Sequence, residues 1–245
     1  MTREMIVAHE VAHQWWYNVV GSDQAREPFL DEALATYSHL LYFEMVRGSA
    51  AWVLAGLRSS YYSYLELEGD RPLNSTLYSF DGDQMGYFAI IYHKGALALH
   101  MLRAALGDRA FFEGLRRYYR ENMFSLATLA DLRRAMEEAS GQDLSWFFDG
   151  WLGARGVPSY AVVNFTLTRS EGGYLLDLTL ADVKGTGLSA PVRVLVVTGC
   201  GNLSRTVWVN GSPARLSLEL GCRPLAVVPD PDDLVPGRDR PLILG

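Results

Sequence analysis

The spacing of apolar residues changes once along this chain. Up to about residue 152, apolar positions recur every three to four residues, which is the period of an amphipathic α-helix. After the glycine-rich segment 153–158 they alternate with polar positions, as in half-buried β-strands. The change predicts a helical region followed by a β-rich region, with a boundary near residue 157.

Glycines and capping residues divide the helical region. Gly21 and Gly48 follow the first two periodic segments, and Thr128 with Asp131 forms an acidic variant of the capping box. The span 69–83 has few periodic apolar residues and is expected to be a long loop, a feature that is often functional. The predicted helices cover about 1–18, 29–46, 51–67, 84–106, 108–122, 129–141 and 143–151.

The β-rich region consists of short alternating runs separated by turns with Gly, Pro, Asn and Asp. Strands at this spacing predict a β-sandwich of six or seven strands. Cys200 and Cys222 lie at similar points near the ends of candidate strands, so one bridge and two buried free thiols both stay open. The alternating runs are 162–168, 174–180, 192–197, 206–209 and 215–220.

Composition narrows the class of protein. With 49% apolar and 20% charged residues, the 245-residue chain is globular. Its net charge of −6, without a Lys/Arg-rich run, argues against a nucleic-acid partner. It contains neither a membrane-spanning apolar segment nor the pattern of a signal peptide. We expect a soluble chain and favour the cytoplasm, while a longer membrane-tethered parent chain stays open.

The candidate chemistry lies in the first helix, where residues 9–13 read HEVAH. Histidines at i and i+4 lie on one helix face and can share a metal ion, with Glu10 placed beside a bound water. A hydrolytic zinc ion takes three protein ligands, which predicts His9, His13 and, one helix later, Glu32. The alternative is an amphipathic helix with two ordinary histidines. His39 is interpreted as a packed or surface histidine, because three ligands suffice.

Three segments resemble one peptidase family. Residues 30–37, LDEALATY, resemble the downstream ligand motif of the gluzincin peptidases. Together with the pentad they are similar to the membrane alanyl aminopeptidase (aminopeptidase N) family, which includes leukotriene A4 hydrolase. Residues 92–95, YHKG, resemble that family's Tyr-x-Lys-Gly motif, whose tyrosine donates to the oxyanion of the tetrahedral intermediate. Tyr87, where some members also carry tyrosine, is interpreted as core packing. Residues 144–158 resemble the family's passage from its helical region to its β-sandwich domain.

This resemblance implies an α+β multidomain fold: a mainly α-helical, thermolysin-like (gluzincin) catalytic region over 1–157 and an immunoglobulin-like β-sandwich over 158–245. It also implies a zinc-dependent metallopeptidase, most consistent with an aminopeptidase that acts on peptide substrates and holds one zinc ion per chain. His9, His13 and Glu32 would bind the zinc. Glu10 would act as general base and Tyr92 would stabilise the oxyanion.

The chain also departs from the family pattern. The family's Gly-x-Met-x-Asn motif, which holds the substrate's amine, lies upstream of the pentad, and only eight residues precede His9 here. We therefore expect the C-terminal part of a longer peptidase, inactive alone if the upstream cleft wall is essential, or a short protein that borrows this wall from a partner. An exposed cleft side would favour self-association. Phe29 and Asp31 stand where the family usually has Trp and Asn; both changes look tolerable.

Two other functions were weighed. One is a zinc hydrolase without N-terminal restriction, which shares the centre but not the amine anchor. The other is a non-enzymatic, zinc-containing interaction module. The presence of Glu10 argues against the second, because a structural zinc site has no use for a carboxylate beside an open position.

Overall fold

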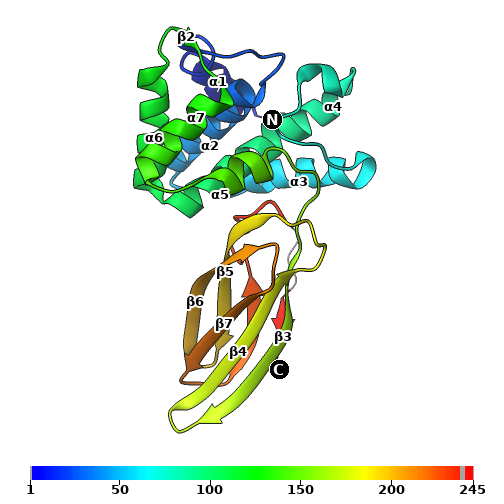
Figure 1. Ribbon diagram of the computed structural model, residues 1–245, viewed down its shortest axis with the longest axis vertical. Coiled ribbons are helices and arrows are strands. Elements are labelled where there is room, and N and C mark those ends of the chain that lie inside the picture. The colour runs from blue at the N-terminus through cyan, green and yellow to red at the C-terminus, as the bar shows by residue number, and fades with distance from the viewer. Residues whose placement is uncertain (1, 238–240, 245) are drawn as a thin grey trace. The chain divides into compact units, whose positions relative to one another are not determined.

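The computed structural model describes residues 2–237 and 241–244 (Figure 1). The chain divides into two compact units, Met1–Arg155 and Gly156–Gly245. The first unit is mainly helical, and the second is built from long strands. The predicted order of a helical region before a β region is therefore confirmed. Residues 1 and 245, the outer bounds of the two predicted regions, lie outside the described residues.

The helices of the first unit follow the predicted segments closely. Gly48 ends α2 in the left-handed conformation with φ 72°, and the capping box of Thr128 and Asp131 is present at the start of α7. None of the described helices combines the length and apolar character needed to cross a bilayer. The helices are α1 (Arg3–Ala12), α2 (Leu34–Arg47), α3 (Ala51–Glu68), α4 (Gln84–Tyr87), α5 (Gly95–Leu106), α6 (Asp108–Glu121) and α7 (Leu129–Ser140), with π-helical η1 (Phe29–Ala33), η3 (Phe88–Lys94) and η4 (Trp146–Trp151) and the 3₁₀ turn η2 (Leu77–Phe80).

The first helix is shorter than predicted. It ends at Ala12. Asn18 then donates two hydrogen bonds to the carbonyl of His13, one from its backbone N–H (3.1 Å) and one from its side-chain amide (2.8 Å). The chain then extends into β1 (Val20–Gly21), which pairs in parallel with β2 (Ser125–Leu126). A Cβ on Gly21 would lie 3.0 Å from the Ser125 carbonyl oxygen, so this glycine permits the close strand pairing. The spacing of apolar residues along the chain does not indicate these tertiary contacts, so it predicted too long a first helix.

The core of the first unit surrounds the segments that carry the candidate chemistry. Phe29 and Ala33 of η1, and Ile90 and Ile91 of η3, are fully excluded from solvent. These two π-helical segments pack against each other and against α5. Side chains on η1 and η3 are therefore held by a rigid, apolar framework.

The second unit contains two antiparallel sheets. One has the strand order β3-β4-β7 and the other β6-β5-β8-β9. In β4 and β5 buried apolar residues alternate with less buried ones, as the period of two predicts. The described residues of this unit contain seven strands, within the predicted six or seven, although no alternating run was predicted for the last two. The immunoglobulin-like assignment stays a prediction. The strands are β3 (Tyr160–Ser170), β4 (Gly173–Asp182), β5 (Ser189–Thr198), β6 (Gly201–Asn210), β7 (Ala214–Leu220), β8 (Pro224–Pro229) and β9 (Leu242–Ile243).

A disulfide joins Cys200 and Cys222, whose Cα atoms lie 6.0 Å apart. Of the two alternatives that the sequence leaves open, the structure has the bridge, and no free thiol occurs among the described residues. Disulfides are rare in cytosolic proteins, because their thiols are kept reduced. The pairing therefore weighs against the cytoplasmic expectation.

Candidate metal centre

Three predicted ligand side chains come together in the first unit. The Nε2 atoms of His9 and His13 lie 3.1 Å apart, and Oε2 of Glu32 lies 3.2 Å from the first and 3.5 Å from the second. All three donor atoms lie within 4.8 Å of one another. Two imidazole nitrogens and one carboxylate oxygen form a donor set of the kind that binds hydrolytic zinc. The residues present thus fit a zinc ion.

The local backbone explains how the three side chains meet. His13 follows the last residue of α1 but keeps helical angles, φ −63° and ψ −11°, so the i, i+4 relation to His9 is preserved. Glu32 lies on η1, a π-helical turn, and such turns occur frequently at functional sites. A packing contact between α1 and α2, which continues η1, brings the two segments together.

A second carboxylate supports His13. Oδ1 of Asp31 lies 2.6 Å from Nδ1 of His13, on the side of the ring away from Glu32, and Gln24 donates to the other Asp31 oxygen at 2.5 Å. The same Nδ1 lies 3.2 Å from the carbonyl oxygen of Trp16, in hydrogen-bonding geometry. Metal-ligating histidines commonly donate their second ring N–H to a carboxylate or a backbone carbonyl, which fixes the ring orientation. The sequence interpretation gives Asp31 only as a tolerable departure from the family motif. The signal that could have indicated its role is its position next to the predicted ligand Glu32.

Hydrogen bonds shift the pKa values within this cluster. Those to Asp31 and Glu32 raise the pKa of His13 to about 10. Burial acts to raise the pKa of Glu32, but hydrogen bonds from His13, His9 and Tyr92 outweigh it and lower that pKa to about 2. In the metal-free cluster these hydrogen bonds keep Glu32 ionised, as a metal ligand must be, and keep His13 protonated, so zinc binding would displace the His13 proton.

The other two predicted catalytic residues differ in their surroundings. Glu10 is exposed on α1, one residue after the buried His9. The Tyr92 ring stacks on the His9 ring at 5.5 Å between centroids, and burial together with the neighbouring Glu32 raises the pKa of its hydroxyl. The hydroxyl of Tyr92 is therefore a proton donor at neutral pH.

A glycine permits the approach of Tyr92 to Glu32. Gly95 follows η3, and a Cβ built on it would lie 2.6 Å from the Cβ of Ala33 on η1. Real Cβ atoms essentially never approach so closely, so the two segments pack at this distance only with glycine there. The glycine of the YHKG motif thus has a packing function.

Two residues near the cluster were interpreted as non-catalytic. His39 is fully buried, its ring centroid lies 6.0 Å from that of His9, and burial lowers its pKa to about 4. It is a packed, neutral histidine. Tyr87 is only half-buried, and its ring lies 5.6 Å from the Tyr92 ring.

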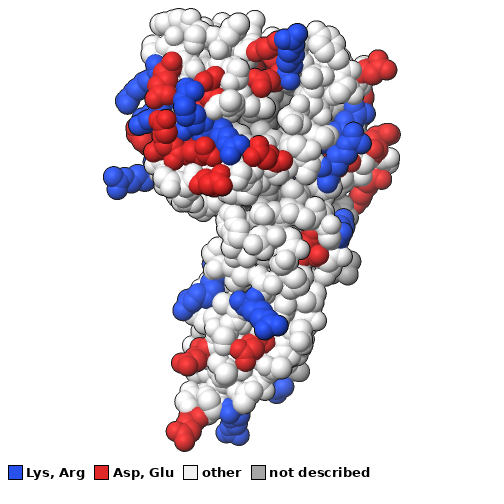
Figure 2. All heavy atoms as spheres, in the orientation of Figure 1, with Lys and Arg blue, Asp and Glu red and all other residues white. Residues whose placement is uncertain are grey.

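A hollow of about 510 Å³ lies beside these aromatic rings, and the long loop over 69–83 supplies much of its lining. Its wall includes Phe88, whose ring lies 4.7 Å from that of Tyr92, but none of the three candidate metal ligands. On the face drawn in Figure 2, acidic and basic side chains are interspersed over the helical unit and form no single-sign patch. The hollow is lined by Leu77, Tyr78, Phe80, Asp81, Gly82, Asp83, Gln84, Tyr87 and Phe88.

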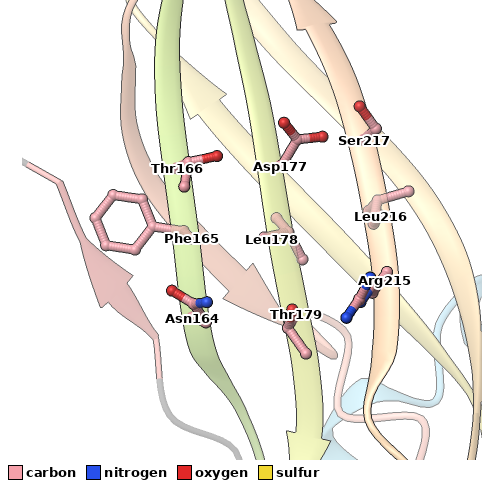
Figure 3. A pocket seen from close by; sticks show the side chains of 9 residues that line it. All are labelled: Asn164, Phe165, Thr166, Asp177, Leu178, Thr179, Arg215, Leu216 and Ser217. Atoms are coloured by element: carbon pink, nitrogen blue, oxygen red, sulfur yellow. The ribbon is translucent and has the colours of Figure 1, made fainter.

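A separate hollow of about 470 Å³ lies on one face of the sheet β3-β4-β7 (Figure 3). Asn164, Thr166 and Asp177 point into it, whereas the Phe165 ring is turned away, as the alternation along a strand requires. It contains no histidine or cysteine and resembles no hydrolytic centre. Its lining residues are Asn164, Phe165, Thr166, Asp177, Leu178, Thr179, Arg215, Leu216 and Ser217.

Known proteins resemble this chain in sequence and in fold. Over 188 residues it is 31% identical to "Aminopeptidase N" of Lactococcus lactis subsp. lactis, a match that covers 70% of this chain and 21% of that protein. Over 217 residues it is 30% identical to "Probable aminopeptidase 2" of Sulfurisphaera tokodaii, covering 87% and 26%. The crystal structure of Legionella pneumophila aminopeptidase A in complex with aspartic acid matches with a TM-score of 0.75 and 19% identity, over 96% of this chain and 26% of that chain.

These matches differ in what they establish. The likeness to the Legionella structure, at 19% identity, shows the fold. The chain spans about a fifth to a quarter of the length of these relatives. Residues 2–151, well over half of the chain, match the family model described as "Peptidase family M1 domain". The chain therefore belongs to peptidase family M1.

Proposed function

We propose that this chain carries the catalytic centre of a zinc-dependent aminopeptidase, which hydrolyses N-terminal residues from peptides. The observation that carries the proposal is the convergence of His9, His13 and Glu32 within 4.8 Å, beside Tyr92. Relatives named as aminopeptidases support it. Because the chain spans only part of their length, the activity is proposed for this chain and is tested on it.

Each residue has a defined task in this proposal. His9, His13 and Glu32 hold the zinc, which polarises a carbonyl and lowers the pKa of water toward about 7 when bound. Glu10 accepts a proton from the attacking water and passes it to the leaving amine. The Tyr92 hydroxyl donates to the oxygen that gains negative charge, a contribution of about 3–4 kcal/mol for one well-placed donor.

The proposal also assigns the two parts of the chain. Residues 1–157 form the thermolysin-like (gluzincin) catalytic region, and residues 158–245 form an immunoglobulin-like β-sandwich. The helical character of the first unit and the two antiparallel sheets of the second support this assignment.

Zinc content tests the ligand set. We expect about one zinc per purified chain by elemental analysis, a large loss in Glu32→Ala, and no loss in the control Glu113→Ala, since Glu113 forms an exposed ion pair with Arg116 on α6. No zinc after reconstitution, or equal zinc in wild type and Glu32→Ala, would contradict the proposed site.

The substrate class is tested with a pair of compounds. A free aminoacyl anilide and its N-acetylated twin differ only in the charged amine, so an aminopeptidase cleaves the first. Equal cleavage of both would favour a zinc hydrolase without N-terminal restriction. If a zinc-loaded chain cleaved neither compound, the proposed activity would be wrong for this chain.

A further inference from the structure

A buried lysine lies behind the helical segment that carries Tyr92. The side chains of Lys94 and Asp70 are 2% and 3% exposed, and their ammonium and carboxylate groups lie 2.7 Å apart. Lys94 also donates to the carbonyl of Arg71 at 3.0 Å, and the Tyr61 hydroxyl donates to the second Asp70 oxygen at 3.0 Å. This cluster joins η3 to α3 and to the start of the loop over 69–83.

Tyr92 and Lys94 leave η3 in different directions. Residues two apart on a helix do not face each other. Tyr92 contacts His9 and Glu32, whereas Lys94 contacts Asp70 and lies over the Tyr61 ring at 5.9 Å. The ion pair therefore contacts the segment from the side opposite to the metal cluster.

A second anchor holds the preceding turn. The carboxylate of Asp83 accepts from the backbone N–H of Gly86 at 2.8 Å and from the Tyr64 hydroxyl at 2.7 Å. Arg71 donates to the same carboxylate at 3.1 Å, while its own carbonyl accepts from Lys94. The loop is thus fastened at both ends to the continuous helical stretch of α4 and η3.

Stability alone does not explain this arrangement. A buried ion pair contributes little net stability compared with well-packed apolar residues, because both charges lose their hydration. A π-helical turn is a rare backbone form, found mostly as single turns, so its geometry depends on surrounding contacts. The ion pair and its two additional hydrogen bonds are directional, so they constrain the orientation of this turn in a way that apolar contacts do not.

We infer that Lys94, paired with Asp70, is a positioning residue that holds Tyr92 at the distance needed to stabilise the oxyanion. This inference rests on the proposed function, in which Tyr92 is the oxyanion donor. The described contacts of Lys94 are with Asp70, the Arg71 carbonyl and the Tyr61 ring, and none of them is with a candidate metal ligand. Its effect on turnover passes through Tyr92.

The test is a double-mutant cycle with Lys94→Met and Tyr92→Phe on the zinc-loaded chain. Misplacing a catalytic group by about 1 Å costs up to about 100-fold, so Lys94→Met should lower kcat by about 10- to 100-fold with KM little changed. In the Tyr92→Phe background, Lys94→Met should cause almost no further loss. If the two losses multiply independently, the inference is wrong.

Two control variants separate positioning from a general loss of stability. Lys94→Met/Asp70→Asn also removes the carboxylate charge that loses its ammonium partner in Lys94→Met, so it should restore the melting temperature without restoring kcat. Arg103→Met removes a cation of α5 that pairs with Glu44 and Asp108, and its effect on kcat should be independent of Tyr92→Phe. Recovery of kcat in the double variant, or coupling of Arg103 to Tyr92, would overturn the inference.

Amide hydrogen exchange separates this inference from the proposed function. In Lys94→Met/Asp70→Asn, protection should fall in residues 88–94 and stay unchanged in α7. Unchanged protection in residues 88–94 would overturn the inference even if the chain were inactive. If Tyr92→Phe left the wild-type rate unaltered, the role of Tyr92 in the proposed function would be wrong, and the positioning role would fall with it.

Discussion

At the scale of single residues, Glu10 differs from the metal-ligand candidates in its exposure. His9 is buried and Glu32 is half-buried, whereas Glu10 is exposed to solvent. Glu10→Gln keeps the size of the side chain but cannot accept a proton. It should retain zinc and lower kcat by about 10²- to 10⁴-fold, measured beside the zinc content.

A second carboxylate of α1 serves as the control for this variant. Glu4 pairs with Arg47 at 3.0 Å near the start of the helix, so Glu4→Gln should leave kcat unchanged. Substantial turnover in Glu10→Gln would remove the general-base role from Glu10.

The positions of the candidate site residues were predictable wherever a short motif contains them. His9, His13, Glu32 and Tyr92 were all named from short motifs, and their side chains do meet. The contacts of Asp31 with His13, and of Lys94 with Asp70, were not predictable. Each joins residues 18 to 24 positions apart, and no local pattern indicates which of many acidic residues faces a given cation.

At the scale of elements, Gly95 determines how closely α5 approaches η1. An added Cβ would meet the Cβ of Ala33 at 2.6 Å, and both residues are fully buried helical positions with little room to move. Gly95→Ala should lower the free energy of unfolding by about 1–3 kcal/mol, the usual cost of overpacking a core. It should also lower kcat, because relieving the clash between residues 95 and 33 would move Tyr92 away from Glu32.

The control is Gly56→Ala on α3, where an added Cβ would meet nothing within 4 Å. Alanine is favoured over glycine by about 1 kcal/mol within a helix, so this variant should be slightly more stable. Urea titration measures both changes. Equal stability of the two variants would show that the approach of α5 to η1 is not limited by Gly95.

In the first unit the sequence predicts which segments are helical, but it does not predict whether a segment is an α-helix or a π-helix. The capping box at Thr128 and the glycine after α2 give local signals that the structure bears out. The π-helical form of η1 and η3 has no such signal. A π-helical turn contains about one residue more than an α-helical turn, which changes the spacing of apolar residues too little to be recognised in the sequence. The two-residue strand β1 depends on a partner more than 100 residues away.

At the scale of the whole molecule, the change from period 3.6 to period 2 predicted the order of the two units. What periodicity could not determine was the pairing of strands, because β7 joins β4 across two intervening strands. The short β9 has only two residues, too few for an alternating pattern. The state of the cysteines was open for the same reason: the turns at Cys200 and Cys222 meet only once the strands between them are placed.

The disulfide of the second unit gives the last prediction. Cys200 and Cys222 are 22 residues apart, and closing a loop of this length stabilises a protein by about 3 kcal/mol through the entropy of the unfolded chain. Cys200→Ser/Cys222→Ser should therefore lower the free energy of unfolding by about that amount, and dithiothreitol should do the same to the wild type. Urea titration measures both.

Thiol titration of the unfolded protein is the independent control. The wild type should show no reactive thiol, and Cys200→Ser should show one, since the described residues contain no free cysteine. Two reactive thiols in the wild type, with an unchanged urea midpoint in the double variant, would contradict the bridge.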